Sequence, residues 1–256
     1  MKKIGRLFLV AAFLCLVTSI AFAGSTKDIT VSAAISLKNA FEEIGRVYEG
    51  QYGIKCIFNF GGSGDLAKQI AGGAPADVFA SAAQKDMDDI EKQGLIVTGT
   101  RADFAANSIV LIVPAGTKTS LKSFRGLKAT EIKKIAVGNP KTVPAGRYAE
   151  EVCNFYQLLP AIKDKLIYAE NVRQVLDYVV RGEVDAGVVY TTDAAISAKE
   201  VKVIATAPET SHKPVVYPIT VIKGTKSEAD AKAFISLVLS QKGKEILQKY
   251  GFKPNK

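Results

Sequence analysis

The sequence predicts an α/β protein of two lobes, each a mixed β-sheet flanked by helices, joined by two crossover segments. Two observations lead to this prediction. Short β-rich runs alternate with segments of helical apolar spacing along most of the 256 residues. Two longer β runs, 107–116 and 215–222, enclose a middle block of the same alternation. If the first run leaves one lobe and the second returns to it, a cleft lies between the lobes.

The first lobe is expected to contain three strand–helix pairs before the first long run. Strands of this kind are rich in β-branched residues, and glycines end the helices between them. The expected strands are 28–34, 54–60 and 76–81, and the expected helices are 36–50, 63–72 and 83–94.

The rest of the chain continues the alternation and closes with a long helix. The expected strands are 107–116, 133–140, 185–191, 201–206 and 215–222, and the expected helices are 143–159, 169–182 and 228–251. The crossing points divide the chain into a discontinuous first lobe and a continuous second lobe. The first lobe is 24–106 plus 213–256, and the second is 107–212.

The first 23 residues are predicted to be a cleaved signal peptide rather than part of either lobe. Three basic residues precede a short apolar run, 7–17, and "AFA" at 21–23 is an A-x-A cleavage site. The alternative is an uncleaved anchor, but a spanning helix needs about 20 apolar residues. A lipoprotein is disfavoured because Cys15 follows Leu14 inside the apolar run. The chain is therefore expected to be exported, soluble after cleavage and periplasmic.

Charge and residue content exclude several classes of function. The formal net charge is +9, of which the leader contributes three basic residues, so the remainder carries about +6. The lysines are scattered, so nucleic-acid binding is not expected. The one histidine, His212, has no credible nucleophile or metal-ligating cluster around it and is interpreted as a solvated loop residue. An exported phosphoesterase is thus a weak alternative, and the chain is not expected to be an enzyme or to need a cofactor.

Two cysteines, Cys56 and Cys153, follow the leader. They could pair in an oxidising compartment. They lie in a strand-like and a helix-like run about a hundred residues apart, so two buried, unpaired thiols are the preferred interpretation.

Four predicted helix starts share small or hydroxyl-bearing residues. They contain Ser36, Ser63, Ala145 and Val172. A helix start has backbone N–H groups without partners and a partial positive charge, so it favours anions. Ordinary capping explains either serine taken alone. Four such starts around one cleft would instead surround a small anion with neutral donors.

The glycine loop "NFGGSGDLAKQI" has two rival interpretations as a nucleotide site. Gly62, Gly64 and Ala67 match a dinucleotide fingerprint, but the following strand offers no acidic partner. A P-loop requires lysine after the last glycine, where this chain has Asp65. Asp65 is compatible with a small anion if it points away and caps the helix.

Several longer blocks resemble one known family. These are "ITVSAAISLKNAFEEI", "GAPADVFASA", "VPAGRYAEEV", "AENVRQVLDYV", "GVVYTTDA" and the late "YGF". In order and content the chain resembles the periplasmic molybdate-binding proteins of ABC importers, over essentially its whole length after the leader. The resemblance implies the two-lobed type II periplasmic binding protein fold.

The resemblance also implies a ligand set of two serines, two backbone amides and one tyrosine hydroxyl. Matched block by block, these are Ser36, Ser63, Ala145, Val172 and Tyr190. They would bind molybdate or tungstate through its oxygens, with no side chain bonded directly to the metal. The family often has serine or alanine at the loop glycines, so this loop departs somewhat from its pattern.

The function implied is high-affinity binding of molybdate or tungstate between the lobes, and delivery to a membrane permease and its ATPase. A monomer is expected of such a carrier. Another tetrahedral oxyanion such as sulfate is the alternative ligand, because sequence does not give cavity size.

Overall fold

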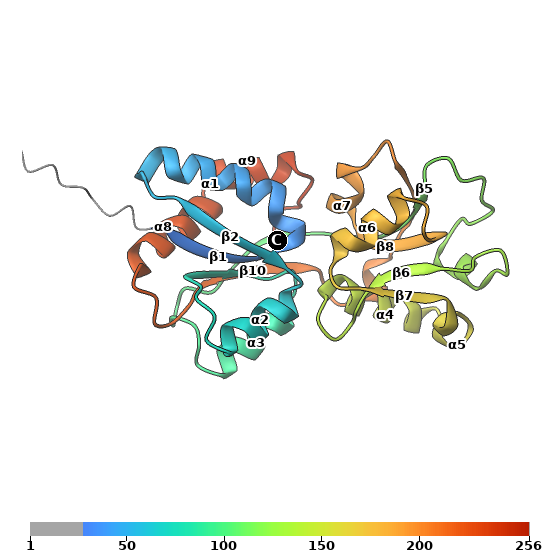
Figure 1. The fold of residues 1–256 in the computed structure, drawn as a ribbon, viewed down its shortest axis with the longest axis horizontal. Coiled ribbons are helices and arrows are strands. Elements are labelled where there is room, and N and C mark those ends of the chain that lie inside the picture. Colours follow the sequence, from blue (N-terminus) through green and yellow to red (C-terminus); the bar gives the residue numbers. More distant parts are fainter. Residues whose placement is uncertain (1–27, 256) are drawn as a thin grey trace, which may run out of the picture.

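The computed structural model describes residues 28–255 and contains two lobes side by side, each built on its own β-sheet (Figure 1). The predicted signal peptide lies outside the described residues. Among the residues described, no helix is long and apolar enough to cross a membrane.

The first sheet has five strands in the order β2-β1-β3-β10-β4. β1, β2 and β3 are parallel, and β10 runs antiparallel to β3 and β4. Helices α1 and α9 cover one face of this sheet, and α2 and α3 cover the other (Figure 1). The elements are β1 Ile29–Ala34, η1 Ile35–Leu37, α1 Lys38–Tyr52, β2 Cys56–Gly61, α2 Ser63–Ala71, β3 Val78–Ala80, α3 Gln84–Lys92, β4 Ala102–Ala106, β10 Val216–Val221, α8 Glu228–Leu239 and α9 Gln241–Lys249.

The second sheet has five strands in the order β7-β6-β8-β5-β9. β6, β7 and β8 are parallel, and β5 runs antiparallel to β8 and β9. Its elements are β5 Ile109–Pro114, η2 Phe124–Lys128, β6 Ile135–Gly138, α4 Pro144–Phe155, α5 Leu159–Ile162, η3 Lys163–Lys165, β7 Leu166–Ala169, α6 Val172–Val180, β8 Ala186–Tyr190, α7 Thr191–Ile196, β9 Val201–Thr206 and η4 Glu209–Ser211.

The chain crosses between the sheets twice, after β4 and before β10. The two mixed sheets with flanking helices confirm the predicted fold class. The exact lobe boundaries, 106/107 and 212/213, stay a prediction. In both sheets the turns that carry the candidate ligand residues follow the carboxyl ends of strands, where open α/β sheets bind ligands.

The C-terminal helix was predicted as one element and is in fact two. α8 ends at Leu239, and Ser240 has an extended backbone, with ψ at 167°. Its hydroxyl oxygen accepts a hydrogen bond from the N–H of Gly243 and so caps the start of α9. A serine that competes for backbone donors breaks the helix although the apolar spacing continues through it.

The sequence interpretation missed several short elements, among them the strands β4 and β7 and the helices α5 and α7. β4 and β7 are edge strands, at the ends of their sheets. Exposed edge strands lack clear alternation of apolar and polar residues, as in β7, where both faces are largely exposed.

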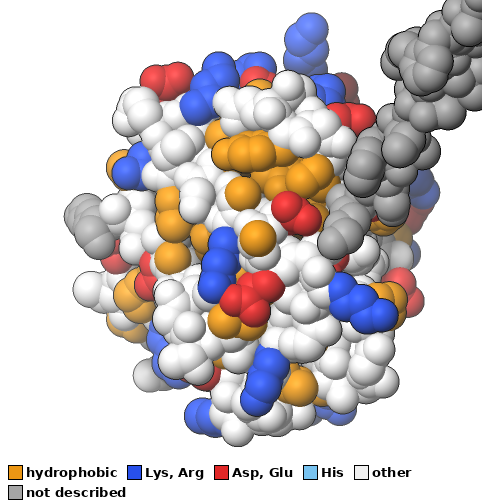
Figure 2. Space-filling model, turned by 90° about the vertical axis from the view of Figure 1, so that its left-hand side faces the viewer, with side chains coloured by type: hydrophobic (Ala, Val, Ile, Leu, Met, Phe, Trp, Pro, Cys, Tyr) orange, Lys and Arg blue, Asp and Glu red, His pale blue; other side chains and the backbone are white. Residues whose placement is uncertain are grey.

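The surface over the outer end of the first lobe carries basic and acidic side chains interspersed, with no continuous basic stripe (Figure 2).

Candidate ligand-binding site

A small cavity between the lobes is lined by all five predicted ligand residues. Its volume is about 10 Å³, which is the scale of a water molecule or a small ion. Organic ligands usually occupy several hundred Å³. The lining residues are Ala34, Ile35, Ser36, Gly61, Gly62, Ser63, Ala82, Val143, Pro144, Ala145, Val172 and Tyr190. None of these side chains carries a charge.

Neither serine caps its helix, so ordinary capping does not account for them. Ser36 lies inside η1 and Ser63 is the first residue of α2, and neither helix has a side-chain cap bond. The hydroxyl oxygen of Ser63 instead accepts a hydrogen bond from the N–H of Ala82 at 3.0 Å. Because that oxygen already has a donor, the hydroxyl hydrogen of Ser63 is available to a ligand. Ala82 belongs to the block "GAPADVFASA", which thereby holds Ser63 in place.

The two backbone amides open helices α4 and α6, where intrahelical acceptors are missing. Within the described part of the chain, the N–H groups of Ala145 and Val172 are not among the donors of backbone hydrogen bonds. Gly146 allows α4 to begin close against β6, since a Cβ there would lie 2.0 Å from the carbonyl oxygen of Gly138. The block "VPAGRYA" therefore encodes a helix start pressed against a strand end.

Tyr190 ends β8 and supplies the fifth polar group. Its hydroxyl oxygen is buried and has no hydrogen-bond partner in the described structure. Burial raises the pKa of this phenol well above its usual value of 10, so it keeps its proton and remains a donor. A buried hydroxyl without a partner is costly unless a ligand or water satisfies it.

Two arginines lie next to the ligand-lining amides, and both are paired. Arg147 forms an ion pair with Asp86 of α3, and Arg173 forms one with Asp193 of α7. Arg173 also donates to the side-chain oxygen of Asn39 in α1 at 3.0 Å. The sequence interpretation missed both pairs, whose partners lie 61 and 20 residues apart. The cavity therefore has neutral walls, with the neighbouring positive charges balanced.

The two lobes touch beside the cavity. The N–H of Gly64 in α2 donates to the carbonyl oxygen of Thr142, which precedes α4, at 2.9 Å. Arg147–Asp86 and Arg173–Asn39 also join helices of different lobes. These contacts make the described arrangement a closed one. Asp65 is half-exposed and lies 3.8 Å from Lys68, so it points away as predicted but does not cap α2.

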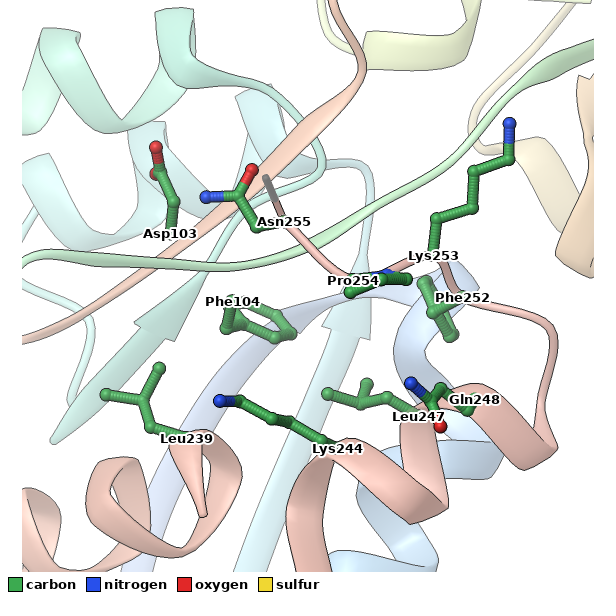
Figure 3. A pocket seen from close by; sticks show the side chains of 10 residues that line it. All are labelled: Asp103, Phe104, Leu239, Lys244, Leu247, Gln248, Phe252, Lys253, Pro254 and Asn255. Carbon is green, nitrogen blue, oxygen red and sulfur yellow. The ribbon is translucent and has the colours of Figure 1, made fainter. Parts of the chain in front are cut away.

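A larger pocket lies elsewhere, between the C-terminal tail and α9. It measures about 290 Å³, and Phe104, Leu247 and Phe252 form its apolar floor (Figure 3). It contains none of the five predicted residues. Its lining includes the charged side chains Asp103, Lys244 and Lys253 and none of the neutral helix starts, so it is not the candidate site.

The remaining titratable residues do not form a reactive centre. Within the described chain, no group of three or more His, Cys, Asp or Glu side chains could hold a metal ion. Cys56 and Cys153 are free, but only Cys153 is buried as predicted, since Cys56 is partly exposed; burial raises the pKa of the Cys153 thiol to about 11. His212 was predicted to be solvated but is only partly exposed, because its ring packs edge-on against Tyr148.

Comparison with known proteins defines the class of this chain. The family model described as "Bacterial extracellular solute-binding protein" matches residues 29–253. The match covers nearly all of the described residues, and the fold agrees with it. The chain is thus an extracellular solute-binding protein of two lobes.

Individual relatives define the family more narrowly. "Molybdate-binding protein ModA" of Haemophilus influenzae is 38% identical over 98% of this chain and 99% of its own length. "Putative ABC transporter substrate-binding lipoprotein YvgL" of Bacillus subtilis is 42% identical over 88% of this chain and 85% of its own. The solved periplasmic molybdate-binding protein of Azotobacter vinelandii has a TM-score of 0.79 and 26% identity, covering 89% of this chain and all of that one. The chain belongs to the ModA family of molybdate-binding proteins, which are substrate-binding components of ABC transporters and not enzymes.

Proposed function

We propose that this chain binds molybdate or tungstate between its lobes and delivers the anion to an ABC importer. The observation that carries the proposal is the buried Tyr190 hydroxyl, which has no hydrogen-bond partner among the described residues and belongs to a side chain that lines the cavity together with the four other proposed ligand residues. The proposed ligand set is Ser36, Ser63 and Tyr190 through their hydroxyl groups, and Ala145 and Val172 through their N–H groups.

Neutral donors suit the task of carrying a dianion. Hydrogen bonds to a charged group contribute about 1.5–3 kcal/mol each. About six or seven of them would contribute roughly 9–21 kcal/mol, compared with the roughly 8 kcal/mol that micromolar affinity requires, which leaves a margin for the cost of closing the lobes. Donors held in fixed directions favour an anion whose shape and size match their arrangement. An ion that bridges both lobes shifts the population toward the closed form by its differential affinity for it.

Sulfate is the second candidate, because it is also a tetrahedral dianion. Isothermal titration calorimetry of the purified protein with molybdate, tungstate, sulfate and phosphate distinguishes the two. We expect sub-micromolar binding of molybdate and tungstate and at least about 100-fold weaker binding of sulfate. Tight sulfate binding without a molybdate signal would overturn the proposal.

Ser63→Ala tests the ligand set directly. The variant loses one donor to the anion and leaves the N–H of Ala82 without its acceptor, so molybdate affinity should fall about 10- to 100-fold. Ser236→Ala is the matched control, since Ser236 is exposed on α8 and should leave affinity unchanged. If Ser63→Ala bound molybdate as tightly as the parent protein, the residue assignment would be wrong.

We further propose that export removes residues 1–23, and that the closed, monomeric carrier docks on a membrane permease powered by an ATPase. The family relationship to ABC transporter components supports the partner, and the leader's cleavage motif supports export. The lobes proposed to move are 24–106 with 213–256, and 107–212. Mass spectrometry of the secreted protein tests the cleavage point, which should leave Gly24 as the first residue.

A further inference from the structure

A chain of buried polar side chains lies behind Ser36 and leads to the first segment that crosses between the lobes. The hydroxyl oxygens of Ser36 and Tyr217, in β10, are 3.1 Å apart. The side-chain nitrogen of Asn107 lies 3.2 Å from the Tyr217 hydroxyl and 2.8 Å from that of Thr192. All four residues are at least nine-tenths buried. The chain therefore connects a proposed ligand residue of the first lobe to α7 of the second.

The direction of each hydrogen bond follows from the orientation of the Asn107 amide. Its side-chain oxygen accepts from the N–H of Ser108 at 2.9 Å, so its nitrogen must face Thr192 and Tyr217 and donate to both. Because the Tyr217 oxygen accepts from Asn107, the phenol hydrogen is left to donate to Ser36. The Ser36 oxygen is thereby an acceptor, and its own single hydrogen has no other protein acceptor within the described residues. That hydrogen is directed to the cavity.

The tyrosine at the centre of this chain is held firmly. The ring of Tyr217 meets Phe104 and Phe252 edge-on, with centroids 6.2 and 5.3 Å away, and Tyr190 at 5.9 Å. Phe252 belongs to the late "YGF" block, which thus contributes to the site from a distance. Burial raises the pKa of Tyr217, so the phenol stays protonated.

We propose that Asn107 and Tyr217 are positioning residues that fix Ser36 as a hydrogen-bond donor toward the bound oxyanion. This inference rests on the proposed function. A serine fixed in this way presents its hydrogen to the ligand and no lone pair, so it does not accept a hydrogen bond from a protonated ligand oxygen. The site therefore favours a fully ionised oxyanion over a singly protonated one, such as hydrogen phosphate.

The first test is Tyr217→Phe, measured by calorimetry with molybdate. Removing the phenol hydroxyl frees the Ser36 hydrogen to rotate, and molybdate affinity should fall about tenfold. Tyr148→Phe is the matched control, because that buried tyrosine makes only a 3.4 Å contact to Pro214 through its hydroxyl and should bind like the parent. The ratio of molybdate to phosphate affinity should also fall in Tyr217→Phe. A purely structural loss would weaken both ions alike.

The second test reverses the direction of the hydrogen bonds that run from Asn107 through Tyr217 to Ser36. In Asn107→Asp the introduced carboxylate only accepts, so Tyr217 donates to it, Ser36 donates to Tyr217, and a lone pair of Ser36 faces the anion. Molybdate affinity should fall at least about 100-fold. Adding Tyr217→Phe disconnects Ser36 from the reversed chain. The double variant should therefore bind about tenfold more tightly than Asn107→Asp alone.

The outcomes separate the two proposals. The positioning role is wrong if Tyr217→Phe binds molybdate like the parent, or if the double variant is no tighter than Asn107→Asp. A parent protein that binds none of the four oxyanions would instead overturn the proposed function. Thermal unfolding of each variant without ligand shows whether it is folded. If Asn107→Asp does not fold, the ratio of molybdate to phosphate affinity in Tyr217→Phe still tests the positioning role.

Discussion

Gly64→Ala is expected to weaken molybdate binding about 100-fold while both lobes stay folded. Gly64 is the second residue of α2 in the first lobe, and an added Cβ would lie 2.7 Å from the carbonyl oxygen and 2.9 Å from the Cα of Thr142 in the second lobe. Both are backbone atoms, which cannot turn aside. Overpacking of this kind costs about 1–3 kcal/mol, and we expect the upper end because the N–H bond from Gly64 to Thr142 would also be strained. The cost arises only when the lobes close.

The neighbouring glycines provide graded controls. A Cβ at Gly61 would meet only the side chain of Leu66, at 3.4 Å, so Gly61→Ala should bind like the parent protein. A Cβ at Gly62 would lie 3.1 Å from the carbonyl oxygen of Glu170 and 3.2 Å from that of Thr142, so Gly62→Ala should be intermediate. Calorimetry gives the affinities, and small-angle X-ray scattering with molybdate should show Gly64→Ala more expanded than the parent. Equal affinity in all three variants would mean that closure does not need this contact.

This series also shows what the sequence could and could not predict about the loop. Strand, glycines and amphipathic helix indicated a helix start open to a small anion, and that interpretation agrees with the turn from β2 into α2. The reason for Gly62 and Gly64 was not visible, because it depends on Thr142 and Glu170, which are distant in sequence. The glycines differ by their neighbours across the cleft, and a local pattern carries no information about those.

The same limit explains which groups around the cavity were missed. Four of the five candidate residues follow from local signals, since helix starts after strands are read from spacing and turn residues. Tyr190 was predicted only from the family resemblance, because the sequence pattern around a strand tyrosine does not show whether its hydroxyl has a hydrogen-bond partner. Tyr217 and Asn107 gave no signal for the same reason. Their role depends on hydrogen bonds between residues 110 and 181 positions apart.

Removing Arg147 is expected to weaken molybdate binding about 100-fold as well, for an electrostatic reason. Arg147 of α4 pairs with Asp86 of α3 across the two lobes, and the side chains are only 16% and 3% exposed. Removing one member of a buried pair typically costs 3–5 kcal/mol, because the other charge stays buried alone. We expect the lower end for Arg147→Met, since Arg147 keeps some solvent contact. Arg101→Met is the control, because Arg101 pairs with Asp88 and Glu91 of its own lobe and should leave affinity unchanged.

The double variant Asp86→Leu with Arg147→Met separates charge from packing. Without a buried carboxylate, the closed form no longer pays for an unpaired charge, and affinity should return to within about tenfold of the parent. A double variant as weak as Arg147→Met alone would show that the contact acts by shape rather than charge.

The pH dependence of Arg147→Met gives the sharpest evidence for the ion pair. Burial raises the pKa of Asp86 above its ordinary value of 3.8 even with Arg147 beside it, and losing that partner raises the pKa further. A carboxyl whose pKa is raised on closure favours the closed form when protonated, so closure becomes easier as pH falls through that pKa. Molybdate affinity of Arg147→Met should therefore rise as the pH is lowered from neutral toward the raised pKa of Asp86, and it should rise more than that of the parent protein. A flat profile for the variant would contradict a buried, unpaired Asp86.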